Sequence, residues 1–146
     1  MTYLLDTNVF LEFLLEQENA DEASELLEKL SAGFGISLFA LYSIGIILTR
    51  RGSASAFLQL VEDIEETGTV VVQLHLSDMS DVITAMQQHS LDFDDAYQYT
   101  VAEKYDLTIV SCDRDFDRTS RGRTTPGILL RELERQNDEN QDNDTK

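Results

Sequence analysis

The stretch that decides the fold is LDFDDAYQYTVAEKYDLTIVSCDRDF, residues 91–116. Its first part, from Asp92 to Lys104, carries acidic residues at the start, where the positive end of a helix favours them, and it predicts a helix. The segment from Leu107 to Cys112 is short and mostly apolar, which is typical of a parallel strand covered on both faces. Asp113 follows directly after it. The stretch therefore predicts a helix, a buried strand and an acidic residue at the carboxyl end of that strand.

The same alternation of strand and helix recurs along the rest of the chain. Short apolar runs predict further strands at residues 3–5, 34–37 and 69–74. Apolar residues at helical spacing, together with capping residues, predict helices over residues 7–15, 19–33, 38–48, 53–66, 77–89 and 126–135. Strands that alternate with helices indicate an α/β fold of three layers, in which helices flank a mostly parallel central sheet.

The length and composition of the chain limit the organisation to one domain. With 146 residues, 42% of them hydrophobic, it can bury one core, which we expect to span residues 1–136. Residues 137–146, NDENQDNDTK, contain no apolar side chain, and we expect them to be disordered. We expect neither a signal peptide nor a membrane anchor, and the single cysteine, Cys112, is consistent with a reducing, cytoplasmic location.

The charge balance opposes general binding to nucleic acid. The net charge of −17, from 28 acidic and 11 basic residues, repels phosphate, so a nucleic-acid substrate would need a local basic patch. Four arginines crowd around the acids that follow the last predicted strand, namely Arg114, Arg118, Arg121 and Arg123. They could form such a patch, or they could be solvated loop residues that balance the nearby aspartates.

Acidic residues cluster at the expected ends of strands and starts of helices. In parallel sheets ligands bind outside the carboxyl ends of the strands, which makes Asp6 and Asp113 candidates, and Asp92, Asp94 and Asp95 lie at the start of a predicted helix. Carboxylates that converge must either raise their pKa values or share a cation, for which Mg²⁺ or Mn²⁺ is suited. The alternative is that each acid only caps a helix or closes a turn.

Other uses of these acids fit the sequence poorly. An EF-hand loop starting at Asp113 would need glycine and glutamate where Arg118 and Thr124 stand. A phosphoacceptor receiver domain would need a lysine after a late strand, and residues 107–125 contain none. A phosphatase with an Asp-x-Asp motif would need an acid at Asn8.

Three segments resemble the PIN domain family in their order, namely LLDTNVFLEFL, ISLFALYSIGIIL and LDFDDAYQYTVAEKYDLTIVSCDRDF. The resemblance extends to about Leu133 and implies a three-layer PIN-like fold over residues 1–136. Small single-domain members of this kind are similar to the VapC-type toxins of toxin–antitoxin pairs. The resemblance therefore implies an endoribonuclease that depends on Mg²⁺ or Mn²⁺, acts on RNA, forms a homodimer, is neutralised by an antitoxin protein and has no membrane association.

The resemblance also implies roles for individual acids. The metal ligands would be Asp6, Asp95 and Asp113, which are also the expected catalytic residues. Asp115 would be an additional ligand. Three aspartates can hold Mg²⁺, because this ion keeps several waters and needs only one or two carboxylates.

The neighbours of these acids carry further expectations. Asn8, Ser43 and Ser111 would support the ligands, and Arg114 or Arg118 would position the RNA backbone. The family usually has a glutamate where this chain has Ser43, so the pocket lacks one charge and one ligand. The alternative function is therefore a PIN-fold binding or interaction module with weakened or absent catalysis.

Overall fold

The computed structural model describes residues 1–29 and 33–145. Four strands, β1 (Tyr3–Leu5), β2 (Phe34–Ser37), β3 (Val70–Val72) and β4 (Thr108–Val110), form one parallel sheet in the order β3-β2-β1-β4. The α-helices in these ranges are α1 (Thr7–Leu14), α2 (Ala20–Lys29), α3 (Leu38–Arg50), α4 (Ala54–Thr67), α5 (Met79–His89), α6 (Phe93–Tyr105) and α7 (Pro126–Asp144). Two short 3-10 helices, η1 (Leu76–Asp78) and η2 (Arg114–Arg118), precede α5 and follow β4. The expected α/β class with a parallel central sheet is confirmed.

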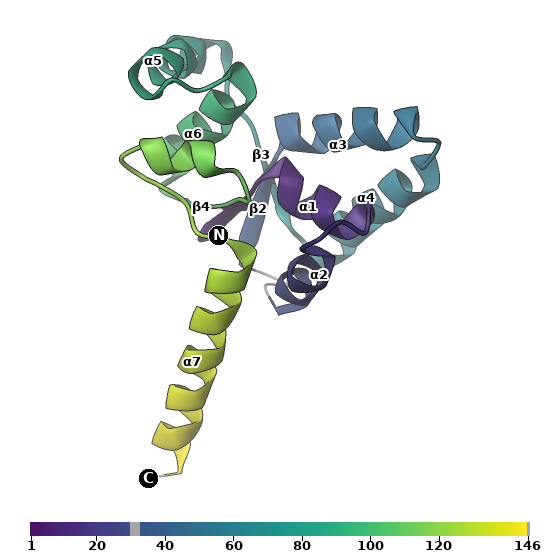
Figure 1. The fold of residues 1–146 in the computed structure, drawn as a ribbon, viewed down its shortest axis with the longest axis vertical. Helices are drawn as coiled ribbons and strands as arrows, with labels where there is room; N and C mark the ends of the chain where they lie inside the picture. Colours follow the sequence, from purple (N-terminus) through teal and green to yellow (C-terminus); the bar gives the residue numbers. More distant parts are fainter. Residues whose placement is uncertain (30–32, 146) are drawn as a thin grey trace.

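The helices cover both faces of the sheet, which gives three layers (Figure 1). One core contains side chains from α1, α2, α3, α4 and α7, and the other contains side chains from α5, α6 and η2. Successive strand residues serve opposite cores: Leu4 and Ile109 face α6, whereas Leu5 and Val110 face α1. This alternation explains why β1 and β4 carry buried apolar side chains on both faces, whereas the edge strand β3 leaves Val70 and Val71 exposed.

The pairing of the two central strands fixes where the site lies. Leu5 of β1 is in register with Val110 of β4, so the residues that follow, Asp6 and Ser111, leave the sheet at the same edge. The backbone N–H of Asp6 donates to the carbonyl of Val110 at 3.0 Å and extends this pairing by one residue. Two chain segments more than 100 residues apart are thereby brought side by side.

The last helix is longer than the sequence predicts. The predicted end near Arg135 is wrong, because α7 continues to Asp144, and the expected disorder of residues 137–146 stays a prediction. Its buried residues are confined to the first turns, Pro126, Leu129 and Leu130. Beyond Arg135 the helix is mostly asparagine and aspartate, which favour helices only weakly, and none of these residues is buried, so this part of α7 gains no stability from packing against the core. Figure 1 shows this half of α7 projecting away from the layers.

Smaller differences concern the ends of other elements. β3 and β4 are each shorter than the apolar runs that contain them, because the chain leaves the ladder before the apolar character ends. The predicted helix from Asn19 to Gly33 is described as far as Lys29, and Leu30 lies outside the described residues. The remaining helices lie where they were predicted.

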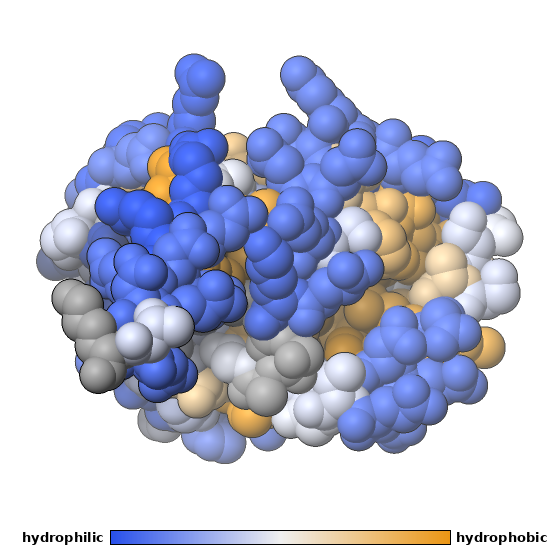
Figure 2. Space-filling model, turned by 90° about the horizontal axis from the view of Figure 1, so that it is seen from below, coloured by the Kyte–Doolittle hydropathy of each residue, from blue (hydrophilic) through white to orange (hydrophobic). Residues whose placement is uncertain are grey.

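The surface reflects the acidic composition. Figure 2 views the molecule from the end toward which α7 points, and most of that face is hydrophilic. Within residues 1–29 and 33–145, none of the helices combines the length and the apolar character that crossing a membrane requires.

Candidate metal centre

A pocket of about 450 Å³ opens at the carboxyl edge of the sheet. It lies between the start of α1, one face of α3 and the first turns of α6. Its lining combines acids and amides with apolar side chains of α1 and α3, namely Asp6, Thr7, Asn8, Leu11, Phe39, Ser43, Ile46, Ile47, Asp94, Asp95, Gln98 and Asp113. The three acids predicted to be catalytic therefore share one pocket.

Asp6 is held by four hydrogen bonds. It caps α1, and its Oδ1 accepts from the backbone N–H of Thr7 at 2.9 Å and from Nε2 of Gln98 at 3.1 Å. Its Oδ2 accepts from the hydroxyl of Ser111 at 2.8 Å and from Nδ2 of Asn8 at 3.3 Å. Asp6 is 6% exposed, so these donors replace the water that an ionised carboxylate would otherwise bind.

Asp95 and the acids after β4 form one group of potential ligand atoms. One carboxylate oxygen each from Asp95, Asp113 and Asp115 can be chosen so that all lie within 4.8 Å of one another. Asp113 caps η2 and accepts a hydrogen bond from the backbone N–H of Asp115 at 2.8 Å, which holds these two acids together. Asp95 is only 8% exposed, and across the described residues nothing donates a hydrogen bond to its side chain or pairs with it as a cation.

Burial and mutual repulsion disturb the titration of these carboxyl groups. Burial is the largest cause that raises the pKa of Asp95 to about 7, followed by the negative charges of Asp113, Asp94, Asp6 and Asp115. Burial also raises the pKa of Asp6, although its hydrogen bonds oppose this effect. The site therefore carries more negative charge than it can solvate, which is the condition that a bound cation relieves.

The donor set fits a hard divalent cation. Carboxylate oxygens are the ligands that Mg²⁺ and Mn²⁺ prefer, and Mg²⁺ uses few of them because it keeps part of its water shell. Asp95 supplies a buried carboxylate without a protein partner, and Asp113 and Asp115 supply two more at a reachable separation. On these residues the expected cation is chemically compatible with the pocket.

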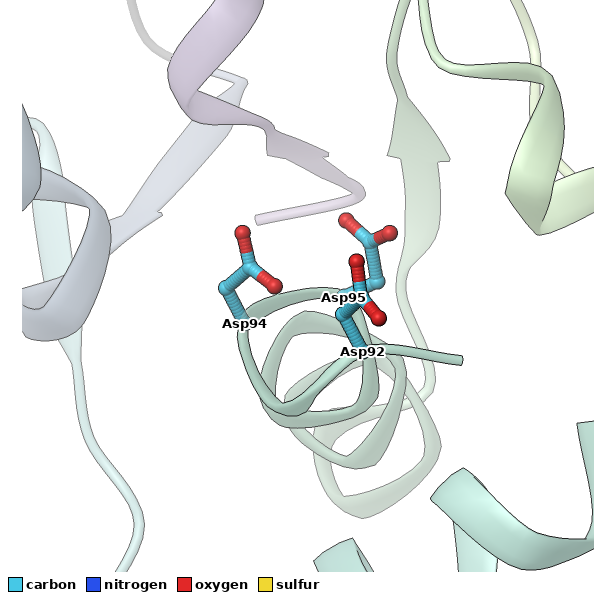
Figure 3. Close-up of side chains that lie close together, drawn as sticks. All are labelled: Asp92, Asp94 and Asp95. Carbon is cyan, nitrogen blue, oxygen red and sulfur yellow. The ribbon is translucent and has the colours of Figure 1, made fainter. Parts of the chain in front are cut away.

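A second group of acids lies at the start of α6. Figure 3 shows Asp92, Asp94 and Asp95 projecting from its first turn, and oxygens of these three residues also lie within 4.8 Å of one another. Asp92 and Asp94 are exposed, and acids in a first helical turn are stabilised by the helix dipole without any bound ion. We attribute the exposed Asp92 and Asp94 to this interaction with the helix dipole.

The predicted supporting residues differ in what they contact. The Ser111 hydroxyl donates to Asp6 and accepts from the backbone N–H of Asp113 at 2.9 Å, so it links two of the acids. Oδ1 of Asn8 accepts from the backbone N–H of Cys112 at 3.1 Å, which ties the start of α1 to the loop after β4. Ser43 lines the pocket, but its hydroxyl donates to the carbonyl of Phe39 in its own helix at 2.9 Å.

The four arginines near the site have different roles. Arg121 donates to the carbonyl of Leu107, and Arg123, whose side chain is 11% exposed, donates to the carbonyl of Ser111. Both therefore stabilise the fold. Arg114 is exposed, and Arg118 forms an ion pair with Asp115 at 3.1 Å while half of its side chain stays exposed.

Gln98 and Ser37 are the polar residues of the site that sequence reasoning missed. Gln98 lies three residues after Asp95, on the same face of a helix whose residues 95–102 are all buried. Ser37 is the last residue of β2 and the N-cap of α3, and its hydroxyl donates to Oε1 of Gln98 at 2.6 Å. The available sign in the sequence was a glutamine three residues after Asp95, a spacing that places both side chains on one helix face.

The chain was compared with known proteins and structures. A toxin–antitoxin complex from Klebsiella pneumoniae has a TM-score of 0.69 and 18% identity, covering 86% of this chain and 98% of that chain. The sarcin–ricin-loop-cleaving toxin VapC20 of Mycobacterium tuberculosis has a TM-score of 0.72 and 17% identity, covering 82% and 96%. FitAcB of Neisseria gonorrhoeae has a TM-score of 0.65 and 19% identity, covering 86% and 98%.

These similarities in structure concern the fold, and the match in sequence identifies the family. No curated protein sequence matches the chain. The model of the PIN domain matches residues 3–122, which include every strand and the whole pocket described above. The chain belongs to the PIN domain family.

Proposed function

We propose that this protein is a Mg²⁺- or Mn²⁺-dependent endoribonuclease and the toxin of a type II toxin–antitoxin pair. PIN domains are generally nucleases, which supports phosphodiester cleavage at family level. The similar structures include a toxin–antitoxin complex and a toxin that cleaves the sarcin–ricin loop. They support RNA as the substrate and a small protein as the neutralising partner.

The convergence of acids at the sheet edge carries the proposal. Asp95, Asp113 and Asp115 come from two distant segments, and their oxygens approach within 4.8 Å. A fold stabilised only by packing gains nothing from placing like charges so close, because each raises the free energy of ionising the others. A cation-binding role accounts for this cost, and helix capping alone does not account for a buried Asp95.

Each residue of the pocket has a definite role in this proposal. Asp95, Asp113 and Asp115 would bind the cation, together with Asp6 at the end of β1. When bound, a divalent cation activates water for attack on phosphorus and stabilises the charge that develops on the phosphate. Phe39, on the α3 side, lines the pocket with an apolar ring, which lowers the local dielectric constant and strengthens electrostatic interactions beside it.

Attraction of RNA then depends on positive charges near the pocket, because the net charge of the whole protein is negative. The net charge of −17 repels phosphates, so attraction must come from the cation and from nearby arginines. Arg114 is exposed, and Arg118 is held beside the acids by Asp115. We assign both to contacts with the phosphate backbone.

The proposed partners are a second copy of this chain and an antitoxin. Tyr42 and Ile46 of α3 are 60% and 51% exposed, and Ile46 lines the acidic pocket. Exposed large apolar side chains beside a functional pocket favour protein contacts there. Light scattering of the purified chain tests the dimer, and co-purification with a co-expressed basic peptide partner tests the antitoxin.

Cleavage of RNA by the purified chain tests the function. The substrate is a labelled RNA pool with randomised single-stranded loops, incubated with Mg²⁺, with Mn²⁺ or with EDTA. We expect cleavage with either cation and none with EDTA. In Asp113→Asn we expect a rate at least about 100-fold lower, since metal-assisted stabilisation of the phosphate contributes several kcal/mol. Asp138→Asn removes an exposed carboxylate of α7 and serves as the control with unchanged cleavage.

Ser43 supports the second candidate function, a PIN-fold interaction module without nuclease activity. Its hydroxyl is bonded within α3, and the pocket lacks the acid that the family usually has there. Specific partner binding by a chain that neither cleaves RNA nor binds a divalent cation would favour this module and contradict the nuclease.

A further inference from the structure

Gln98 is buried at the base of the pocket, and both ends of its amide are used. The side chain is 2% exposed. Nε2 donates to Oδ1 of Asp6 at 3.1 Å, and Oε1 accepts from the hydroxyl of Ser37 at 2.6 Å. The Ser37 oxygen in turn accepts from the backbone N–H of Ala40 at 3.0 Å.

Chemistry fixes the direction of this chain of hydrogen bonds. An ionised carboxylate only accepts, so the NH₂ group of Gln98 must face Asp6. The oxygen of the amide then faces Ser37, whose hydroxyl accepts from the backbone N–H of Ala40 and donates its proton to Oε1. The reverse orientation would place Oε1 against the oxygens of the ionised Asp6, so the Gln98 amide is locked in the observed one.

The locked amide links the parts of the site to one another. Ser37 belongs to the junction of β2 and α3, and Asp6 lies at the junction of β1 and α1. Gln98 shares α6 with Asp95 at a spacing of three residues, which places both on one helix face. The position of Asp6 relative to Asp95 is thereby set through one side chain.

We propose that Gln98 is a positioning residue of the cation site, which holds the Asp6 carboxylate in the orientation that binding requires. This inference rests on the proposed function, since it concerns the same site. Without Gln98, Oδ2 of Asp6 keeps its bonds from Ser111 and Asn8, but Oδ1 keeps only the bond from the adjacent Thr7 backbone, so the carboxylate loses its direct link to α6. Hydrogen-bond partners of this kind commonly change metal affinity by about 10- to 100-fold when removed.

Calorimetric titration of Mn²⁺ into variants of the full chain tests the proposal. Gln98→Leu removes the amide and keeps a side chain of similar size. Thr100→Val is the matched control, because Thr100 is also buried in α6 but its hydroxyl donates only to the carbonyl of Ala96 within the same helix. We expect an affinity about 10- to 100-fold weaker in Gln98→Leu and unchanged in Thr100→Val.

A second measurement does not depend on how well the variant folds. The side-chain amide resonances of Gln98 in the wild-type chain are followed by nuclear magnetic resonance during titration with Mg²⁺. We expect the Gln98 resonances to shift along a saturation curve whose midpoint gives the dissociation constant of the cation site. The resonances of the exposed Gln141 on α7 should not shift. Gln98 resonances that stay unmoved while Mg²⁺ binds would show that the hydrogen bond from Gln98 to Asp6 is not coupled to the cation site.

The outcomes separate this inference from the proposed function. Wild-type affinity in a folded Gln98→Leu, or Gln98 resonances that ignore bound Mg²⁺, would overturn the positioning role and leave the nuclease proposal standing. A wild-type chain without a specific cation site would overturn both. Weakened binding confined to Gln98→Leu, with shifting Gln98 resonances, supports the role.

Discussion

Replacing Asp95 with asparagine removes a negative charge from the most crowded part of the pocket while keeping almost the same shape. Asp95 has a pKa raised from its ordinary 3.8 to about 7, chiefly by burial and then by Asp113 and the other acids. Each pKa unit corresponds to about 1.4 kcal/mol, so ionising Asp95 costs at most about 4 kcal/mol more in the folded chain than in the unfolded chain. Relaxation of the pocket around the charge lowers this cost. We therefore expect cation-free Asp95→Asn to be more stable than the wild type by about 1 to 3 kcal/mol at about pH 8.

The difference in stability between Asp95→Asn and the wild type depends on pH. Between about pH 4 and the raised pKa of about 7, folded Asp95 keeps a proton that the unfolded chain has released. The wild type therefore loses stability as the pH rises through this range, and the full cost of the ionised group is present above it. Asparagine does not titrate, so the advantage of the variant should grow from near zero at about pH 4 to its full value at about pH 8.

Urea unfolding in EDTA at several pH values measures the difference. The control is Asp138→Asn, which removes an exposed acid and should stay within about 0.5 kcal/mol of the wild type throughout. An Asp95→Asn protein that is less stable than the wild type at about pH 8, or a difference that does not change with pH, would refute the desolvated and crowded environment of Asp95.

Three further predictions concern the surroundings of the site. Arg118→Ala removes a cation paired with Asp115 and should weaken RNA binding and reduce its salt dependence, measured by filter binding at several salt concentrations, without abolishing Mn²⁺ binding. Arg123→Ala leaves the carbonyl of Ser111 without its donor and should lower the free energy of unfolding by about 1 to 3 kcal/mol, measured in urea. A chain without residues 137–146 should unfold within about 0.5 kcal/mol of the full chain, because the side chains of 137–145 are exposed, and a larger loss would show contacts that this account lacks.

The sequence indicated the sheet and the main acids because these depend on short-range patterns. Apolar runs located all four strands, and the rule that ligands bind at the carboxyl ends of parallel strands selected Asp6 and Asp113. Asp95 was singled out from Asp92 and Asp94 by the resemblance to the PIN domain family. Their arrival in one pocket agrees with the expectation, while their roles as ligands and catalysts stay predictions.

The hydrogen bonds between these elements could not be predicted in the same way. Gln98 meets Ser37 and Asp6 only because α6 packs across the start of α3, and these residues are 61 and 92 positions apart in the chain. The end of α7 was misjudged because composition alone does not reveal where a solvent-exposed helix stops. Arg123 resembled a loop cation, yet it satisfies a carbonyl of the loop after β4.

The central claim is a specific divalent-cation site made by the acids at the sheet edge, and Asp113→Asn in a Mn²⁺ titration tests it most directly. Asp113 joins the segment after β4 to Asp95 across the pocket, so its loss should remove the site without touching the core. The account predicts saturable binding by the wild type and by Asp138→Asn, and none by Asp113→Asn. Weak, non-saturable binding that is the same in all three proteins would contradict it.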